Sequence, residues 1–109
     1  MTKENNLWEV RYSERAKEDL KDIVDYIVHV LLEPGIAANI HASITKAVRS
    51  LERLPYRFHL YLEEPFFSLG MRVMKVKNYL IFYIPNEADH TVHVVRMMYA
   101  GRDVRNQLN

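Results

Sequence analysis

Apolar and charged residues alternate near the start of the chain and then give way to a helical spacing. The alternation covers residues 7–12 and predicts a short strand with Trp8, Val10 and Tyr12 on one face. Ser13 follows as a helix N-cap residue, and Glu14 falls in the first turn, where the helix dipole favours an acid. A helix is therefore predicted to begin directly after this strand.

Two amphipathic stretches come next. The first is defined by apolar residues that recur every three or four positions, which are Ala16, Leu20, Ile23, Val24, Ile27, Val30 and Leu31. The segment Glu33-Pro34-Gly35 is expected to end it, because proline cannot continue a helix and glycine permits a turn. The second stretch runs from Ile36 to Leu54 and ends before Pro55. Together they predict an antiparallel helix hairpin whose shared apolar face needs a cover.

The second half of the chain supplies that cover. Residues 55–70 are rich in proline, aromatic residues and glutamate and are expected to form an irregular connection. Strands are predicted over 71–76, 79–84 and 91–100, separated by a turn at Lys77-Asn78 and a loop over 85–90. The middle strand has no polar face, which is typical of a strand buried on both sides. The prediction is a single α+β domain over 1–109, ordered strand, two helices, three strands.

Length and composition narrow the class of protein. The chain has 109 residues and no cysteine, which fits one domain and excludes disulfides, thiolate metal sites and cysteine nucleophiles. No apolar run reaches the roughly 18 residues of a membrane span, and the first six residues are polar. We expect a cytoplasmic protein without a membrane partner.

The net charge of +1 conceals an uneven distribution along the chain. Residues 1–33 contain eight acidic and five basic residues, whereas residues 71–83 contain three basic residues and no acidic one. Residues 96–109 are also basic on balance. Charge blocks of this size are often no more than solvated faces, and they are equally suited to an acidic partner.

Several kinds of chemistry have no support in the sequence. The three glycines, at positions 35, 70 and 101, cannot form a phosphate-binding loop. The five histidines lack the i, i+4 pairing of helical zinc sites, and no serine lies in a nucleophile-elbow context. We therefore expect neither a cofactor nor a metal.

Five segments in order along the chain resemble the RelE/ParE superfamily of toxins from bacterial type II toxin-antitoxin modules. They are 12–23 at the start of the first helix, 50–55 at the end of the second, 70–72, 78–83 and 95–103. The resemblance covers nearly the whole chain. It implies the RelE/ParE-like fold, in which an N-terminal strand and a helix hairpin precede a three-strand antiparallel run in one sheet.

The superfamily contains two mechanisms, and the resemblance leaves both open. RelE-like members cleave messenger RNA on the ribosome with basic side chains on the sheet, whereas ParE-like members poison DNA gyrase. Arg72 matches a basic position of the nucleases, but Met74 and Leu80 stand where those enzymes carry cations. This favours a ParE-like toxin that acts by binding. If the protein is a nuclease, the resemblance implies that the catalytic residues are Arg72, Lys75, Lys77, Arg96, Tyr99 and Arg102.

The same residues also have plainer interpretations. Strand alternation puts Lys75 and Lys77 on one face and Arg72 on the other, so the three do not converge without a bulge. Tyr79 and Tyr83 lie in an apolar run and are expected to belong to the core. Arg96 lies in an apolar strand and needs a partner. Asp103 is the candidate, unless it caps the last turn of the chain instead.

The resemblance also implies partners. An acidic antitoxin that folds on contact would neutralise the toxin, and the target would be DNA gyrase or, for a nuclease, the ribosome and messenger RNA. Such modules are linked to growth inhibition and plasmid stabilization. A third hypothesis is a degenerate member that retains only binding.

Overall fold

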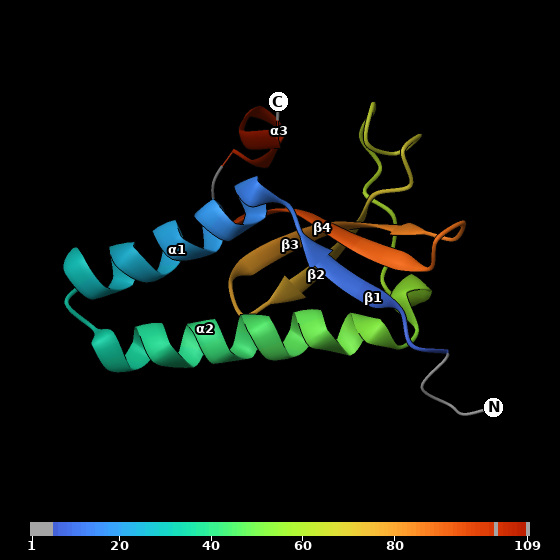
Figure 1. Cartoon of the computed structure of the whole chain (residues 1–109). Helices are drawn as coiled ribbons and strands as arrows, with labels where there is room; N and C mark the ends of the chain where they lie inside the picture. Colours follow the sequence, from blue (N-terminus) through green and yellow to red (C-terminus); the bar gives the residue numbers. More distant parts are fainter. Residues whose placement is uncertain (1–5, 102, 109) are drawn as a thin grey trace.

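The computed structural model describes residues 6–101 and 103–108 and confirms the predicted α+β order. The helices and strands, in chain order, are β1 (Glu9–Tyr12), α1 (Glu14–His29), α2 (Pro34–Arg49), two short 3-10 helices (Ser50–Glu52 and Pro55–Arg57), β2 (Arg72–Val76), β3 (Tyr79–Asn86), β4 (Thr91–Tyr99) and α3 (Val104–Leu108). The helix hairpin of α1 and α2 packs on a twisted sheet (Figure 1).

All four strands form one sheet in the order β1-β4-β3-β2. β1 runs parallel to β4, and the other two pairs are antiparallel, as a three-strand run with an added N-terminal strand requires. β3 is therefore central. Its consecutive residues Ile81, Phe82 and Tyr83 are all fully buried, which confirms that this strand is covered on both faces.

The two faces of the sheet have different covers. On one face, α1 and α2 build the main core with the sheet, whose buried members include Ala16, Ile44, Val48, Ile81 and Val94. On the other face, Met71, Phe82 and Met98 pack with apolar side chains from the 55–70 connection and from α3. The sequence predicted that the two helices cover the first face. It did not predict the cover of the second face, because neither the 55–70 connection nor α3 shows a clear helical or strand period.

The helix hairpin begins as predicted but its boundaries differ. Ser13 caps α1, since its hydroxyl oxygen accepts from the Ala16 backbone N–H at 2.9 Å. α2 begins at Pro34, because proline fits the first turn of a helix, where no N–H partner is needed. The predicted extension of α2 to Leu54 is wrong. The helix ends at Arg49 and passes into the 3-10 helix Ser50–Glu52, and Pro55 disfavours the α-helical conformation at Leu54, so α2 does not run up to the proline. Leu54 has a left-handed backbone and is 74% exposed.

The strands also depart from their predicted limits. β3 continues through Pro85 to Asn86, where a loop was expected, since Pro85 pairs with Val92 without needing its own N–H. A β-bulge interrupts β4, because Phe82 pairs with Arg96 while Tyr83 pairs with Val94. The extra residue, Val95, changes the direction of the side chains that follow it. The bulge puts Arg96 on the face of Phe82 and Met98, and its side chain reaches Asp19 of α1 from there, at a point where β4 extends beyond its pairing with β1.

Candidate functional site

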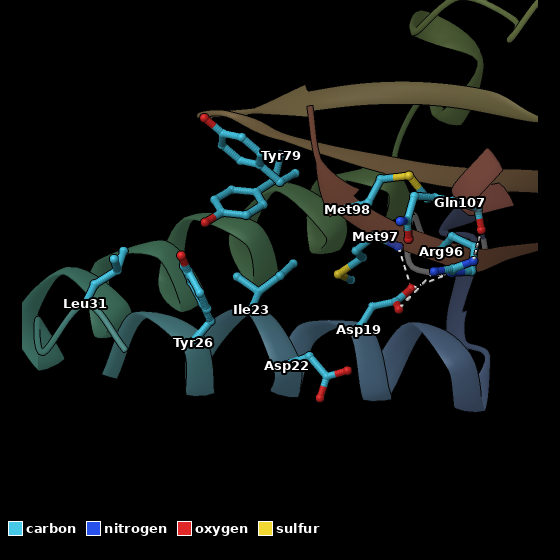
Figure 2. A pocket seen from close by; sticks show the side chains of 11 residues that line it. Asp19, Asp22, Ile23, Tyr26, Leu31, Tyr79, Arg96, Met97, Met98 and Gln107 are labelled. Atoms are coloured by element: carbon cyan, nitrogen blue, oxygen red, sulfur yellow. Dashed lines mark hydrogen bonds and ion pairs between the residues drawn. The ribbon is translucent and has the colours of Figure 1, made fainter. Parts of the chain in front are cut away.

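A groove lies between α1 and the second half of β4 and reaches α3 (Figure 2). Its volume is about 660 Å³, and we call it the α1–β4 groove. It is lined by Asp19, Asp22, Ile23, Tyr26, Leu31, Tyr79, Arg96, Met97, Met98, Tyr99 and Gln107. Figure 2 shows the charged pair Asp19 and Arg96 at one end and tyrosine rings at the other. The groove therefore has a polar end, formed by Asp19 and Arg96, and an aromatic end, formed by tyrosine rings.

The polar end is a buried ion pair. The Asp19 and Arg96 side chains are only 9% and 15% exposed, and Asp19 Oδ2 accepts from Arg96 Nε at 2.7 Å and from the Met97 N–H at 2.9 Å. Arg96 Nη1 donates to the Gln107 carbonyl at 2.7 Å. The pair thus joins α1, β4 and α3, and its charges are matched in the way that burial demands.

Arg96 has a different partner from the one expected. Asp103 lies at the start of α3, where its carboxylate accepts from Asn106 Nδ2 at 2.6 Å. Arg96 instead pairs with Asp19 of α1. Sequence reasoning missed Asp19, although a signal existed. It is an acid three residues after Ala16, on the apolar stripe of an amphipathic helix, where a carboxylate needs a buried cation.

The aromatic end consists of three tyrosines. The Tyr79 and Tyr99 rings meet edge to face with centroids 5.7 Å apart, and Tyr26 and Tyr99 are about half exposed. Burial, together with the neighbouring Tyr99 and Tyr26 hydroxyls, raises the pKa of Tyr79. Gly101 leaves room for the Tyr99 ring, because a Cβ at that position would lie 2.5 Å from a ring carbon. Such rings offer apolar contact area together with polar hydroxyls.

Arg72 lies outside the groove and is held by backbone carbonyls. It occupies the helix-covered face at the start of β2, where Nη1 donates to the Phe58 carbonyl at 2.6 Å and to the Tyr56 carbonyl at 3.2 Å. The guanidinium also lies 4.9 Å from the centre of the Tyr56 ring. Its Nε is buried without a hydrogen-bond partner in the part of the chain that the structure describes. Arg72 therefore ties the 55–58 segment to the sheet.

The remaining predicted site residues are dispersed. Lys75 is exposed on the face of β2 opposite Arg72, as alternation predicted, while Lys77 lies in the β2–β3 turn with φ 55°. Lys77 shares with Tyr99 a second pocket of about 190 Å³ beside the tip of the helix hairpin. Arg102 is outside the described residues. The structure thus brings Arg96 and Tyr99 into one groove and leaves Arg72 and Lys75 apart from it.

The sequence of the chain matches a known family over most of its length. A profile of the ParE toxin of type II toxin-antitoxin systems, parDE, aligns with residues 10–104. The chain belongs to this toxin family. Curated protein sequences, by contrast, include no match to this toxin.

Solved structures share the fold of this ParE-family toxin. A chain of the chromosomal ParDE toxin-antitoxin system from P. aeruginosa is 18% identical with a TM-score of 0.69, covering 86% of this chain and 97% of that one. A chain of the RelBE2 toxin-antitoxin complex from Mycobacterium tuberculosis is 23% identical with a TM-score of 0.60, covering 85% and 98%. A free E. coli RelE toxin mutant is 12% identical with a TM-score of 0.64, covering 93% and 92%.

Other features of the toxin bear on its chemistry. Tyr83 belongs to the core, as expected, and its hydroxyl donates to the Pro55 carbonyl at 2.7 Å. Burial raises its pKa to about 12, so the phenol ionises only at strongly alkaline pH. Among residues 6–101 and 103–108, no cluster of three or more His, Asp or Glu is arranged to hold a metal ion. None of the described helices is long and apolar enough to cross a membrane.

Proposed function

We propose that this ParE-family toxin arrests growth by binding and inhibiting DNA gyrase. The observation that carries the proposal is the engagement of the two sheet arginines. Asp19 neutralises Arg96, and backbone carbonyls occupy Arg72. Both arginines are thus held by groups within the protein, and of the three strand cations that a nuclease would use, only Lys75 is left exposed.

Ribonuclease chemistry demands a different arrangement. In-line cleavage needs a base for the ribose 2′-hydroxyl, cations beside the developing phosphorane charge and a donor for the leaving oxygen, all within hydrogen-bond reach of one phosphate. Here Leu80 stands in β3 opposite Lys75, and it packs in the second core. A toxin that acts through its surface needs no such convergence.

An antitoxin is proposed as the second partner, docked on the α1–β4 groove. The groove offers tyrosine rings and apolar walls, and Lys77 lies beside it on the β2–β3 turn. An acidic, amphipathic segment that folds on contact would place its apolar face in the groove and its carboxylates near this lysine. Reversing the charge of Lys77 should weaken that complex, whereas unchanged affinity would contradict this docking site.

The gyrase proposal is tested with purified components. Supercoiling of relaxed plasmid by DNA gyrase is measured with increasing toxin, and the matched control is the same toxin preincubated with its antitoxin. Inhibition by free toxin that the antitoxin reverses is the expected result. Undisturbed supercoiling at micromolar toxin would refute the proposal.

A second candidate function is ribosome-dependent cleavage of messenger RNA. It is favoured by one observation, which is that Lys77 and Tyr99 line the same pocket, next to the end of β4 where the chain continues to Arg102. In this reading Lys75, Arg72 and Arg96 would assist. Primer extension on messages after toxin induction would then reveal new ends within codons, and intact messages would remove this candidate.

A further inference from the structure

The segment between the second 3-10 helix and β2 forms a closed loop over residues 61–71. Its base continues the sheet, because the Tyr61 N–H donates to the Met71 carbonyl at 2.9 Å and Leu60 forms a bridge with Arg72. In Figure 1 this loop, drawn in yellow-green and yellow, projects from the sheet on the side away from α2. The chain ends of the loop are thus fixed to a rigid element.

The inside of the 61–71 loop is also ordered. The Glu64 carboxylate accepts from the Ser68 hydroxyl at 2.8 Å and from its N–H at 3.2 Å. The Tyr61 ring packs edge to face on Phe82, with centroids 5.3 Å apart, and lies near Phe66. Glu63 forms an ion pair of 2.7 Å with Arg105 of α3. The loop therefore has its own small core and its own hydrogen bonds, like a compact Ω-loop.

What this ordered loop leaves in solvent is apolar and acidic. Leu62, Phe67 and Leu69 are 76%, 42% and 59% exposed, although Tyr61 and Phe66 of the same loop are largely covered. Glu63 and Glu64 are its charged residues, and no lysine, arginine or histidine occurs from 61 to 71. Large apolar side chains on a surface mark interaction sites when they lie close together on a defined element.

We propose that the 61–71 loop is the element by which the toxin engages its target protein, and that it enters an apolar cleft with a basic rim on that protein. The inference rests on the proposed function in so far as that target is gyrase. Charge complementarity selects this occupant, because Glu63 and Glu64 outnumber the one cation that pairs with them, Arg105, and the loop itself has no basic residue, so it attracts a basic surface. Because the loop is already ordered, binding costs little conformational entropy.

The same charges argue against the other occupants. An acidic antitoxin would be repelled by Glu63 and Glu64, as would the phosphates of a nucleic acid. A second copy of the toxin would bring like charges together across a symmetric contact. The 61–71 loop therefore has the wrong charge for an acidic antitoxin, and it also lies outside the α1–β4 groove, where the antitoxin is proposed to dock.

The test uses substitutions of exposed side chains that leave the loop core intact. The loop variant combines Leu62→Ser with Leu69→Ser, and the matched control is Leu54→Ser, whose side chain is 74% exposed outside the loop. Growth arrest without antitoxin, gyrase inhibition and antitoxin affinity are measured for both. We expect the loop variant to need about tenfold more toxin for the same arrest, the loss typical of an apolar anchor at an interface, with antitoxin affinity unchanged. The control should match the wild type.

A second variant tests the charge. Glu64→Gln keeps the shape, an acceptor for Ser68 and the ion pair between Glu63 and Arg105, and it should reduce potency most at low ionic strength. Full potency of the Leu62→Ser/Leu69→Ser toxin would overturn the proposal, as would lowered antitoxin affinity of that variant or a loss of self-association that accompanies lost toxicity. If wild-type toxin leaves gyrase untouched while the loop variant still loses growth arrest, the gyrase proposal fails and the loop proposal stands.

Discussion

Replacing Asp19 with alanine should destabilise the toxin by about 4 kcal/mol, because it removes one partner of a buried ion pair. The Arg96 side chain is 15% exposed and would retain only the Gln107 carbonyl, while the Met97 N–H would lose its acceptor. Breaking such a pair costs about 3–5 kcal/mol, and an unsatisfied buried N–H costs about 1–3 kcal/mol, part of which the first figure already includes. Domains of this size have about 5–15 kcal/mol of stability, so the loss is a large share.

Urea denaturation followed by tryptophan fluorescence measures this loss. Trp8 is the single tryptophan, it is 8% exposed, and it stacks on His90 with centroids 4.2 Å apart, so its emission should report unfolding. With a slope of about 1.5 kcal/mol per M of urea, the midpoint should fall by about 2–3 M. Asp22→Ala, which removes an exposed acid of the same helix and groove, is the control and should shift the midpoint by less than about 0.3 M.

A double variant separates the destabilisation caused by an unpaired Arg96 from the net stabilisation that the ion pair provides. Asp19→Leu combined with Arg96→Met removes both charges and should recover most of the lost stability, since apolar replacements of buried pairs are often neutral. The reasoning is refuted if Asp19→Ala moves the midpoint by less than about 0.5 M. It is also refuted if the double variant is no more stable than Asp19→Ala alone.

Three further outcomes follow from single contacts. The Tyr83 phenol has a pKa of about 12 in the folded protein and about 10 in the unfolded one, so this contribution to the free energy of unfolding is complete below pH 10 and should fall by about 2–3 kcal/mol as the pH rises to 12. Tyr83→Phe should remove this decrease, which alkaline denaturation of the two proteins measures. Ser13→Ala removes the N-cap bond to Ala16 and the bond to the Val95 carbonyl, and should cost about 1–2 kcal/mol in urea titrations, against nearly no effect for Ser43→Ala. Leu54→Gly relieves a left-handed backbone at φ 53° and should raise the melting temperature by a few degrees, and a lowered one would contradict this account.

Periodicity in the sequence was sufficient to predict the helices and strands that pack against the main core. The stripe from Ala16 to Ile27 and the apolar run Ile81–Tyr83 each depend on burial against many neighbours, so helical and strand patterns are clear there. The same reasoning failed where a local contact decides the backbone. Pro55 prevents a helix from continuing through Leu54, and the pairing of Pro85 with Val92 extends β3. Neither effect appears as a period in the sequence.

The candidate site was predictable only in part, for a related reason. Arg96 was recognised as a cation in need of a partner, but the choice of Asp19 depends on how α1 packs beside β4, which no pattern in β4 predicts. Arg72 was a candidate catalytic residue only for a nuclease, and its contacts with carbonyls of an irregular segment fourteen to sixteen residues earlier were not foreseen. Contacts between an irregular segment and a strand leave almost no trace in the sequence.

The two proposed surfaces can be tested separately only if α3 is left intact. Its Gln107 carbonyl accepts from Arg96 at the α1–β4 groove, and its Arg105 pairs with Glu63 of the 61–71 loop. A truncation before Val104 would therefore disturb both surfaces at once, and it would also uncover Met98 and Phe82 in the second core. Point substitutions avoid this confusion, because Leu62 and Leu69 touch neither Arg96 nor α3 through any polar contact among the described residues. A toxin that loses growth arrest with Leu62→Ser/Leu69→Ser but still binds antitoxin would thus separate target recognition from neutralisation on one small domain.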